Sequence, residues 1–121
     1  MKSSRSHKGL PVGAADGCND TCPVAMTARL IEGKWTTRIV RDLLSGKKRY
    51  SELQRSLAGI SPKILAERLR FLEREGLIDK TIYPVVPPHT EYRLTARGRK
   101  LRGVIAAMAR FGSTVLGSED R

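Results

Sequence analysis

The side chain best suited to redox chemistry is the thiol of Cys22, which stands directly before Pro23 at an expected helix start. The N–H dipoles at a helix N-terminus favour the thiolate, which is the form of cysteine that reacts with quinones, aldehydes, disulfides and peroxides. Cys18 could act as a resolving partner or be incidental. Cys22 could equally be a small buried hydrophobic residue without a redox role. Two cysteines and two distant histidines, His7 and His89, do not predict a zinc site.

A second set of functional groups is cationic and lies in residues 61–75. Ser61 suits an N-cap and Pro62 suits the first helical position. On a helical wheel, Leu65, Leu69 and Leu72 fall on one side and the charged heads fall on the other. Such heads can contact base edges in the major groove, although charged helix faces also occur for solubility alone. The predicted base-reading residues are Lys63, Glu67, Arg68 and Arg70.

The surroundings of this helix are also basic. Between Arg38 and Glu75, ten Lys or Arg residues stand against five acidic ones, and the whole chain carries a formal charge of +11. A small protein this basic usually binds nucleic acid, with solubility as the alternative. Contacts to phosphates would add affinity without sequence information. The predicted phosphate-binding residues are Lys47, Lys48, Arg49, Arg55, Ser61, Arg74 and His89.

The elements that position these groups are expected to be mostly helices. Hydrophobic spacing and Gly or Pro boundaries predict several helices and two strands. The expected elements are a helix from Pro23 to Gly33, a helix from Trp35 to Gly46, a short extended segment from Lys47, a helix capped by Ser51, a helix at 62–75, strands at 77–84 and 90–95, and one last helix capped by Thr95.

This order is the plan of a winged helix-turn-helix protein, mainly α with a small β-hairpin. The helix at 62–75 enters the major groove in that plan, and the loop at 84–90 forms the wing. We expect this domain at residues 22–116, after a flexible basic arm at 1–21 and before a polar tail at 117–121.

The last helix has an apolar face that indicates a dimer formed through the terminal helices. Its apolar residues recur with nearly heptad spacing, which suits helix pairing. The alternative is that the helix merely covers the strands. The predicted dimer-interface residues are Met26, Leu30, Leu101, Ile105, Met108 and Phe111.

Short motifs in consistent order resemble the HxlR-type family of bacterial winged-helix transcription regulators. They are Cys22-Pro23, Gly33-Lys34-Trp35, Arg49-Tyr50-Ser51-Glu52-Leu53, Gly59-Ile60-Ser61, Leu72-Glu73, Gly76-Leu77, Tyr83-Pro84, Pro87-Pro88, Glu91-Tyr92, Leu94-Thr95 and Gly98. The resemblance covers about residues 22–112. It implies a homodimer that binds a palindromic operator, usually as a repressor and sometimes as an activator. In several members, a cysteine matching Cys22 senses electrophiles.

Two features depart from the family pattern. His89 stands where the wing often has Arg or Lys, and a phosphate contact from histidine would be weaker and pH-dependent. A solvent-exposed loop histidine without such a contact is the alternative. The arm before Cys22 is also longer than the usual lead.

Other classes of protein fit the sequence less well. There is no nucleotide-binding loop or nucleophile–base spacing, so we expect no enzyme, no cofactor and no metal. No apolar run is long enough to span a bilayer and no secretory signal is seen, so the expected location is the cytoplasm. The expected partners are double-stranded DNA with an inverted repeat and a second copy of the chain, and the inducer is open. A non-specific architectural DNA-binding protein and a protein-interaction module are the alternatives.

Overall fold

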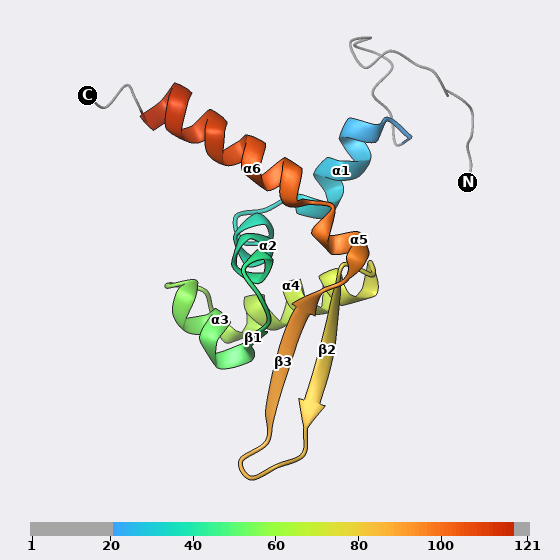
Figure 1. The fold of residues 1–121 in the computed structure, drawn as a ribbon, viewed down its shortest axis with the longest axis vertical. Coiled ribbons are helices and arrows are strands. Elements are labelled where there is room, and N and C mark those ends of the chain that lie inside the picture. Colours follow the sequence, from blue (N-terminus) through green and yellow to red (C-terminus); the bar gives the residue numbers. More distant parts are fainter. Residues whose placement is uncertain (1–20, 118–121) are drawn as a thin grey trace. The chain divides into compact units, whose positions relative to one another are not determined.

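The computed structural model describes residues 21–117, and Figure 1 shows its elements. The chain contacts divide it into a unit that ends at Gly33 and a unit that begins at Lys34. The predicted arm at 1–21 and the predicted tail at 117–121 lie outside the described residues, apart from Thr21 and Gly117.

The described part of the first unit is one helix, α1, Pro23–Ile31. Cys22 is its N-cap and Pro23 is its first residue, as the sequence predicts. A proline suits this position because its missing N–H would have no partner inside the helix. The chain leaves the helix through Glu32 in an extended conformation, followed by Gly33.

The second unit contains the remaining elements. In chain order they are α2 (Thr36–Leu44), β1 (Lys48–Arg49), α3 (Tyr50–Ser56), α4 (Pro62–Arg74), β2 (Ile78–Tyr83), β3 (His89–Leu94), α5 (Ala96–Arg99), α6 (Arg102–Phe111) and a wider π-helical segment, Gly112–Leu116.

The expected hairpin is part of a three-stranded antiparallel sheet with the order β1-β3-β2. Strands β2 and β3 pair from Ile78↔Leu94 to Tyr83↔His89. The short β1 adds to the other edge of β3, with Lys48 opposite Tyr92. The turn between β2 and β3, residues 84–88, forms the tip of the wing (Figure 1).

The core of the second unit is aliphatic, and it confirms the buried leucine stripe predicted for Leu65, Leu69 and Leu72. Buried side chains come from α2, from α3 and its C-cap, from α4, from the start of β2 and from one face of β3. They include Ile39, Val40, Leu43, Leu53, Leu57, Leu65, Leu69, Leu72, Ile78, Tyr92 and Leu94. The leucines of α4 are at most 2% exposed, which fixes the rotation of this helix about its axis.

The prediction that Ser51 caps α3 is wrong. Ser51 lies inside the first turn, the helix begins at Tyr50, and Arg49 occupies the N-cap position. The backbone N–H of Arg49 donates to Oε1 of Glu52 over 2.7 Å. This carboxylate satisfies a terminal N–H group, so the helix does not need a hydroxyl cap at Ser51.

The prediction of one last helix after Thr95 is also wrong, because the chain forms two helices there. Thr95 caps α5, where its Oγ1 accepts from the N–H of Gly98 over 3.0 Å. The N–H groups of Lys100 and Leu101 then bond to carbonyls three residues back rather than four. This tightened turn separates α5 from α6, and Leu101 is buried at the junction.

Candidate nucleic-acid interface

Helix α4 starts with the cap that the sequence predicts. The Oγ of Ser61 accepts a hydrogen bond from the N–H of Ile64 over 3.1 Å, and Pro62 is the first helical residue. Three buried leucines hold the opposite side of the helix against the core. The remaining face of α4 is therefore presented outward in a fixed orientation.

The predicted base-reading residues lie on this outward face. Lys63 and Arg70 are exposed, whereas Glu67 and Arg68 are half-buried. Lys63, Glu67 and Arg70 follow helical spacing along one line. Seven residues of helix rise about 10 Å, which corresponds to about three base-pair steps. Lys63 and Arg70 can therefore address separate base pairs in one major groove.

Phe71 belongs to this surface, although it was not among the predicted site residues. The guanidinium of Arg68 lies 5.5 Å from the centre of the Phe71 ring, and that of Arg74 lies 5.9 Å from it. Cations over an aromatic face are attracted to it, so the ring orients both arginines. The i±3 spacing around Phe71 could have indicated this arrangement from the sequence.

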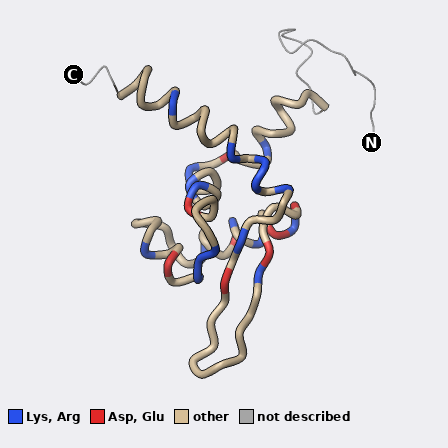
Figure 2. Tube along the Cα trace, in the orientation of Figure 1, with Lys and Arg blue, Asp and Glu red and all other residues tan. Residues whose placement is uncertain are grey.

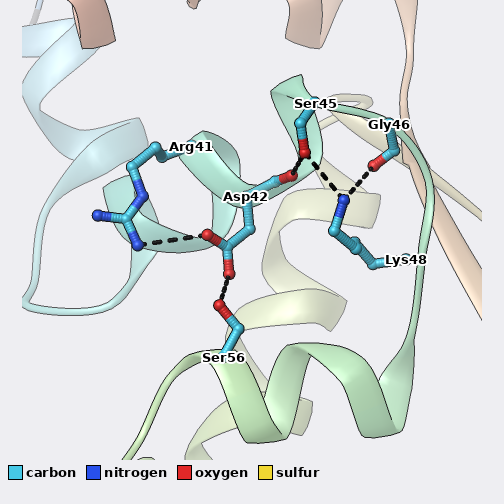
Figure 3. A network of polar contacts seen from close by, with 6 residues as sticks. All are labelled: Arg41, Asp42, Ser45, Gly46, Lys48 and Ser56. Carbon is cyan, nitrogen blue, oxygen red and sulfur yellow. Dashed lines mark hydrogen bonds and ion pairs between the residues drawn. The ribbon is translucent and has the colours of Figure 1, made fainter.

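Contacts from neighbouring helices support α4. The hydroxyl of Tyr50, in α3, donates to the carbonyl of Pro62 over 3.3 Å. At the other end of α3, Ser56 donates to the carboxylate of Asp42 in α2, which also pairs with Arg41 at 3.3 Å (Figure 3). These bonds connect α2, α3 and the start of α4. The sequence alone did not indicate these roles for Asp42, Ser56 or the Tyr50 hydroxyl.

The lysines predicted to bind phosphate already have partners. Lys47 Nζ lies 3.5 Å from Oε1 of Glu91 in β3. Lys48 Nζ donates to Oγ of Ser45 over 2.9 Å, as Figure 3 shows. Loss of hydration raises the pKa of Glu91, but Lys47 and hydrogen bonds from Lys47, Tyr83 and His89 outweigh it, so the pKa lies below its ordinary value.

Two other predicted phosphate contacts, Arg49 and Arg55, are exposed at the two ends of α3. Arg74 is exposed in the last turn of α4. The cations predicted to bind phosphate thus come from β1, α3 and α4. Figure 2 shows the positive segments along these elements.

The wing carries apolar groups instead of cations. No Lys, Arg, Asp or Glu occurs between Lys80 and Glu91, and Figure 2 shows the uncharged outer part of the hairpin. Val86 at the tip is 98% exposed. The ring of His89 stacks on Tyr83 at 4.8 Å, and its Nε2 lies 3.4 Å from Oε2 of Glu91. His89 is thus engaged within the hairpin, and these contacts compete with the predicted phosphate contact.

The candidate sensor and dimer residues lie on α1 and α6 or at their N-caps. Cys22 is 7% exposed at the N-cap of α1, and Cys18 lies outside the described residues. Among the predicted dimer residues, Met26, Met108 and Phe111 are exposed and Leu30 and Ile105 are half-buried. Leu101 differs, since it is 8% exposed and is covered in the single chain. The exposed face of α6 therefore begins after it.

No group of three or more His, Cys, Asp or Glu residues within the range 21–117 could hold a metal ion. No helix within the range is long and apolar enough to cross a membrane.

The fold and this surface define a class of protein. Helices α3 and α4, separated by a short turn, form a helix-turn-helix, and β2 and β3 follow it as a wing, so the second unit is a winged helix-turn-helix domain. Residues 30–120 match the model of the HxlR-like helix-turn-helix family. The chain belongs to this family and is a transcriptional regulator of the helix-turn-helix type.

Several relatives resemble the chain over most of their length. The uncharacterised regulator sll1512 of Synechocystis is 40% identical over 99% of this chain and 91% of its own length. A crystal structure described as a MarR-family regulator from Porphyromonas gingivalis W83 has a TM-score of 0.78 and 42% identity, and it covers 81% of this chain and 96% of that one. The redox regulator HypR in its oxidised form has a TM-score of 0.73 and 36% identity, covering 77% and 96%.

Proposed function

We propose that two copies of this chain bind an inverted-repeat operator and repress the adjacent promoter, in the cytoplasm where the bacterial chromosome lies. The observation that carries the proposal is the outward face of α4, where Lys63 and Arg70 stand exposed opposite a buried leucine stripe. Arginine can bind guanine O6 and N7 with two parallel hydrogen bonds, and lysine can reach the same acceptors.

The surrounding cations position the domain on the DNA backbone in this proposal. Arg49, Arg55 and Arg74 are exposed and can contact phosphates directly, while Lys47 and Lys48 would have to exchange their present partners. In the first turn of α4, Pro62 has no N–H and that of Ile64 donates to Ser61, so the N–H of Lys63 is the group that can receive another phosphate. The uncharged wing would lie against the flanking minor groove.

An exposed apolar surface supports the second copy. Along α6 and the following π-helical segment, Val104, Met108, Phe111 and Leu116 line an open groove of about 680 Å³. On α1, Val24 and Ile31 line another apolar groove of about 400 Å³. Such contiguous apolar patches are uncommon on monomers and mark interaction surfaces. A two-fold dimer would place two α4 helices about 34 Å apart on the operator.

Thiol sensing is a second candidate function, because Cys22 is the N-cap of α1 and because redox regulators occur among the solved relatives. The helix N-terminus favours the thiolate. Its 7% exposure means that an oxidant reaches the sulfur only after a local opening of the chain around it. Modification would then alter α1 and, through the dimer, the half-site spacing.

The test is selection of operators from random duplexes at near-physiological salt, with reduced protein and with protein treated with diamide. We expect an enriched inverted repeat in the reduced sample. Loss of enrichment on oxidation, together with an unaffected Cys22→Ser variant, would support the thiol switch. Strong salt-sensitive binding without enrichment would favour the architectural alternative and contradict the base contacts. Absence of binding at low salt would favour the protein-interaction alternative.

A further inference from the structure

A surface depression of about 420 Å³ lies where α2 joins β1 and where β3 leads into α5. The buried Leu43 and Leu94 and the half-buried Leu44 supply its apolar lining. Its size falls within the range of sites that bind small molecules. All of its lining belongs to the second unit.

The same depression is lined by three cations and by no acidic residue. Lys47 directly precedes β1, Arg93 lies in β3, and Arg99 comes from the end of α5. Glu91 compensates the charge of Lys47, but the two guanidinium groups repel one another unless an anion lies between them. An apolar lining beside clustered cations favours a ligand with a hydrocarbon body and one negative group.

The two arginines are available for such a ligand. Arg99 donates one N–H to the carbonyl of Leu94 over 3.0 Å, which holds its guanidinium beside the depression. The remaining N–H groups of this guanidinium can donate to a ligand. Arg93 is exposed, and within the described residues no ion pair joins it to Asp79, its cross-strand neighbour. Only Lys47 is already paired, with Glu91.

This position is remote from the tip of the wing. Strand β3 runs from His89, beside the tip, to Leu94, beside the depression, and five steps of strand span about 17 Å. Figure 1 shows the junctions of α2 with β1 and of β3 with α5 at the end of the sheet opposite the tip. A phosphate held at the wing tip therefore does not reach these cations.

We infer that this depression is a binding site for a small organic carboxylate with an aromatic or aliphatic body. The carboxylate would lie between Arg93 and Arg99, and the hydrocarbon would pack on the three leucines. Because Arg99 ends α5 and Leu44 ends α2, the ligand would contact both the helix-turn-helix unit and the segment that leads into α6. An effect on operator affinity would rest on the proposed function, whereas the binding itself does not.

The probe is 2-naphthoate, titrated without DNA into the isotope-labelled full chain and followed by backbone amide NMR shifts. We expect saturable shifts confined to residues 43–47 and 93–99. Loss of one charge-assisted contact in Arg93→Gln should weaken binding about ten-fold. The control Lys100→Gln removes an exposed cation that adjoins Arg99 but does not line the depression, and it should leave the affinity unchanged.

Two further probes decide which part of the ligand is recognised. 2-Naphthylmethanol, which has the same rings without the charge, should bind about ten-fold more weakly or not at all. Inorganic phosphate should bind more weakly than naphthoate because it cannot use the leucines. The assignment would be overturned if 2-naphthylmethanol or phosphate bound the wild type as tightly as naphthoate does. It would also be overturned if naphthoate bound Arg93→Gln as tightly as the wild type, or if millimolar naphthoate caused no saturable shifts.

The folded state of each variant is checked by its thermal midpoint. If Arg93→Gln proves unstable, Arg93→Lys keeps the charge and should retain most of the affinity, and the comparison of naphthoate with its neutral analogue in the wild type decides the question. Because no DNA is present, failure here leaves operator binding unaffected, and failure of operator selection leaves this site unaffected.

Discussion

The cations of α4 differ in what they already contact. Arg68 and Arg74 lie over the ring of Phe71, whereas Lys63 and Arg70 make no hydrogen bond or ion pair within the described residues. A side chain without such a contact gives up less when it binds a base. We therefore assign the sharpest base discrimination to Arg70 and a positioning role to Arg74.

Arg70→Ala tests this assignment. It should weaken binding to the selected operator by about 1–3 kcal/mol and relax the preference at one base pair. Arg74→Ala is the matched comparison, since loss of a phosphate contact should weaken all sequences about equally and lower the salt slope. Competition binding against single-base operator variants separates the two outcomes. A uniform loss for Arg70→Ala would place Arg70 on a phosphate instead.

Ser61→Ala tests the helix cap separately from DNA binding. It removes the acceptor for the N–H of Ile64 and should lower the free energy of unfolding by about 1 kcal/mol. Ser51→Ala is the control, because Ser51 is exposed inside α3 and does not cap it. Urea unfolding measures the free energy of unfolding of both variants. An equal loss in the two variants would contradict the capping account.

At the scale of elements, hydrogen bonds connect the residues after α4 to α5 and its N-cap. The Oγ1 of Thr95 donates to the carbonyl of Gly76 over 2.7 Å, and Nε of Arg97 donates to the carbonyl of Glu75 over 3.1 Å. The N–H of Thr95 also donates to the carbonyl of Leu77 over 3.0 Å. These bonds satisfy carbonyls that the end of a helix leaves without partners. Helix α4 and the segment leading to α6 are therefore directly connected.

Gly98 is the residue that permits this close packing. A Cβ at Gly98 would lie 2.1 Å from the carbonyl oxygen of Leu77, a backbone atom that cannot move aside alone. Gly98→Ala should therefore lower the free energy of unfolding by about 1–3 kcal/mol. Gly103→Ala, where an added Cβ has open space in α6, should be neutral or stabilising by up to about 1 kcal/mol. Thermal unfolding of both variants compares them, and a stable Gly98→Ala protein would contradict the packing argument.

The elements that the sequence predicts best are those defined by neighbouring residues. Helix α4 has its cap, its first-turn proline and its leucine stripe within one segment, so its bounds and buried face were predicted. The break between α5 and α6 depends on Gly98 meeting Leu77 and on the burial of Leu101, and both are contacts with distant parts of the chain. Local periodicity does not contain that information.

At the scale of the whole molecule, the cations predicted to contact DNA and the large exposed apolar side chains occupy different elements. The exposed cations predicted to contact DNA lie on α3, α4 and their neighbours, while the large exposed apolar side chains lie on α1, on the wing and on α6 with its π-helical extension. Composition predicted a polyanion partner. It did not predict the leucine-lined depression with three cations, because Lys47, Arg93 and Arg99 meet only after the sheet has formed.

Met108→Asp tests the proposed dimer. Met108 is 46% exposed within the apolar groove of α6, so a carboxylate there should not disturb the core but should oppose pairing of two such grooves. We expect a monomer by light scattering and weak operator binding. Ser113→Asp introduces the same charge at an exposed polar residue outside the groove lining and should remain dimeric. A dimeric Met108→Asp protein would count against this interface.

The hydrogen bonds that join Gly76 and Leu77 to Thr95 have a consequence for hydrogen exchange. The N–H of Leu77 donates to the carbonyl of Leu72, that of Thr95 to the carbonyl of Leu77, and that of Gly98 to Oγ1 of Thr95. None of these bonds can be released without loosening the next, so the three amides should exchange in one cooperative opening. The end of α4 thus shares its local stability with the Thr95–Gly98 segment further along the chain. Any strain on α6 would reach the end of α4 as a change in the frequency of that opening.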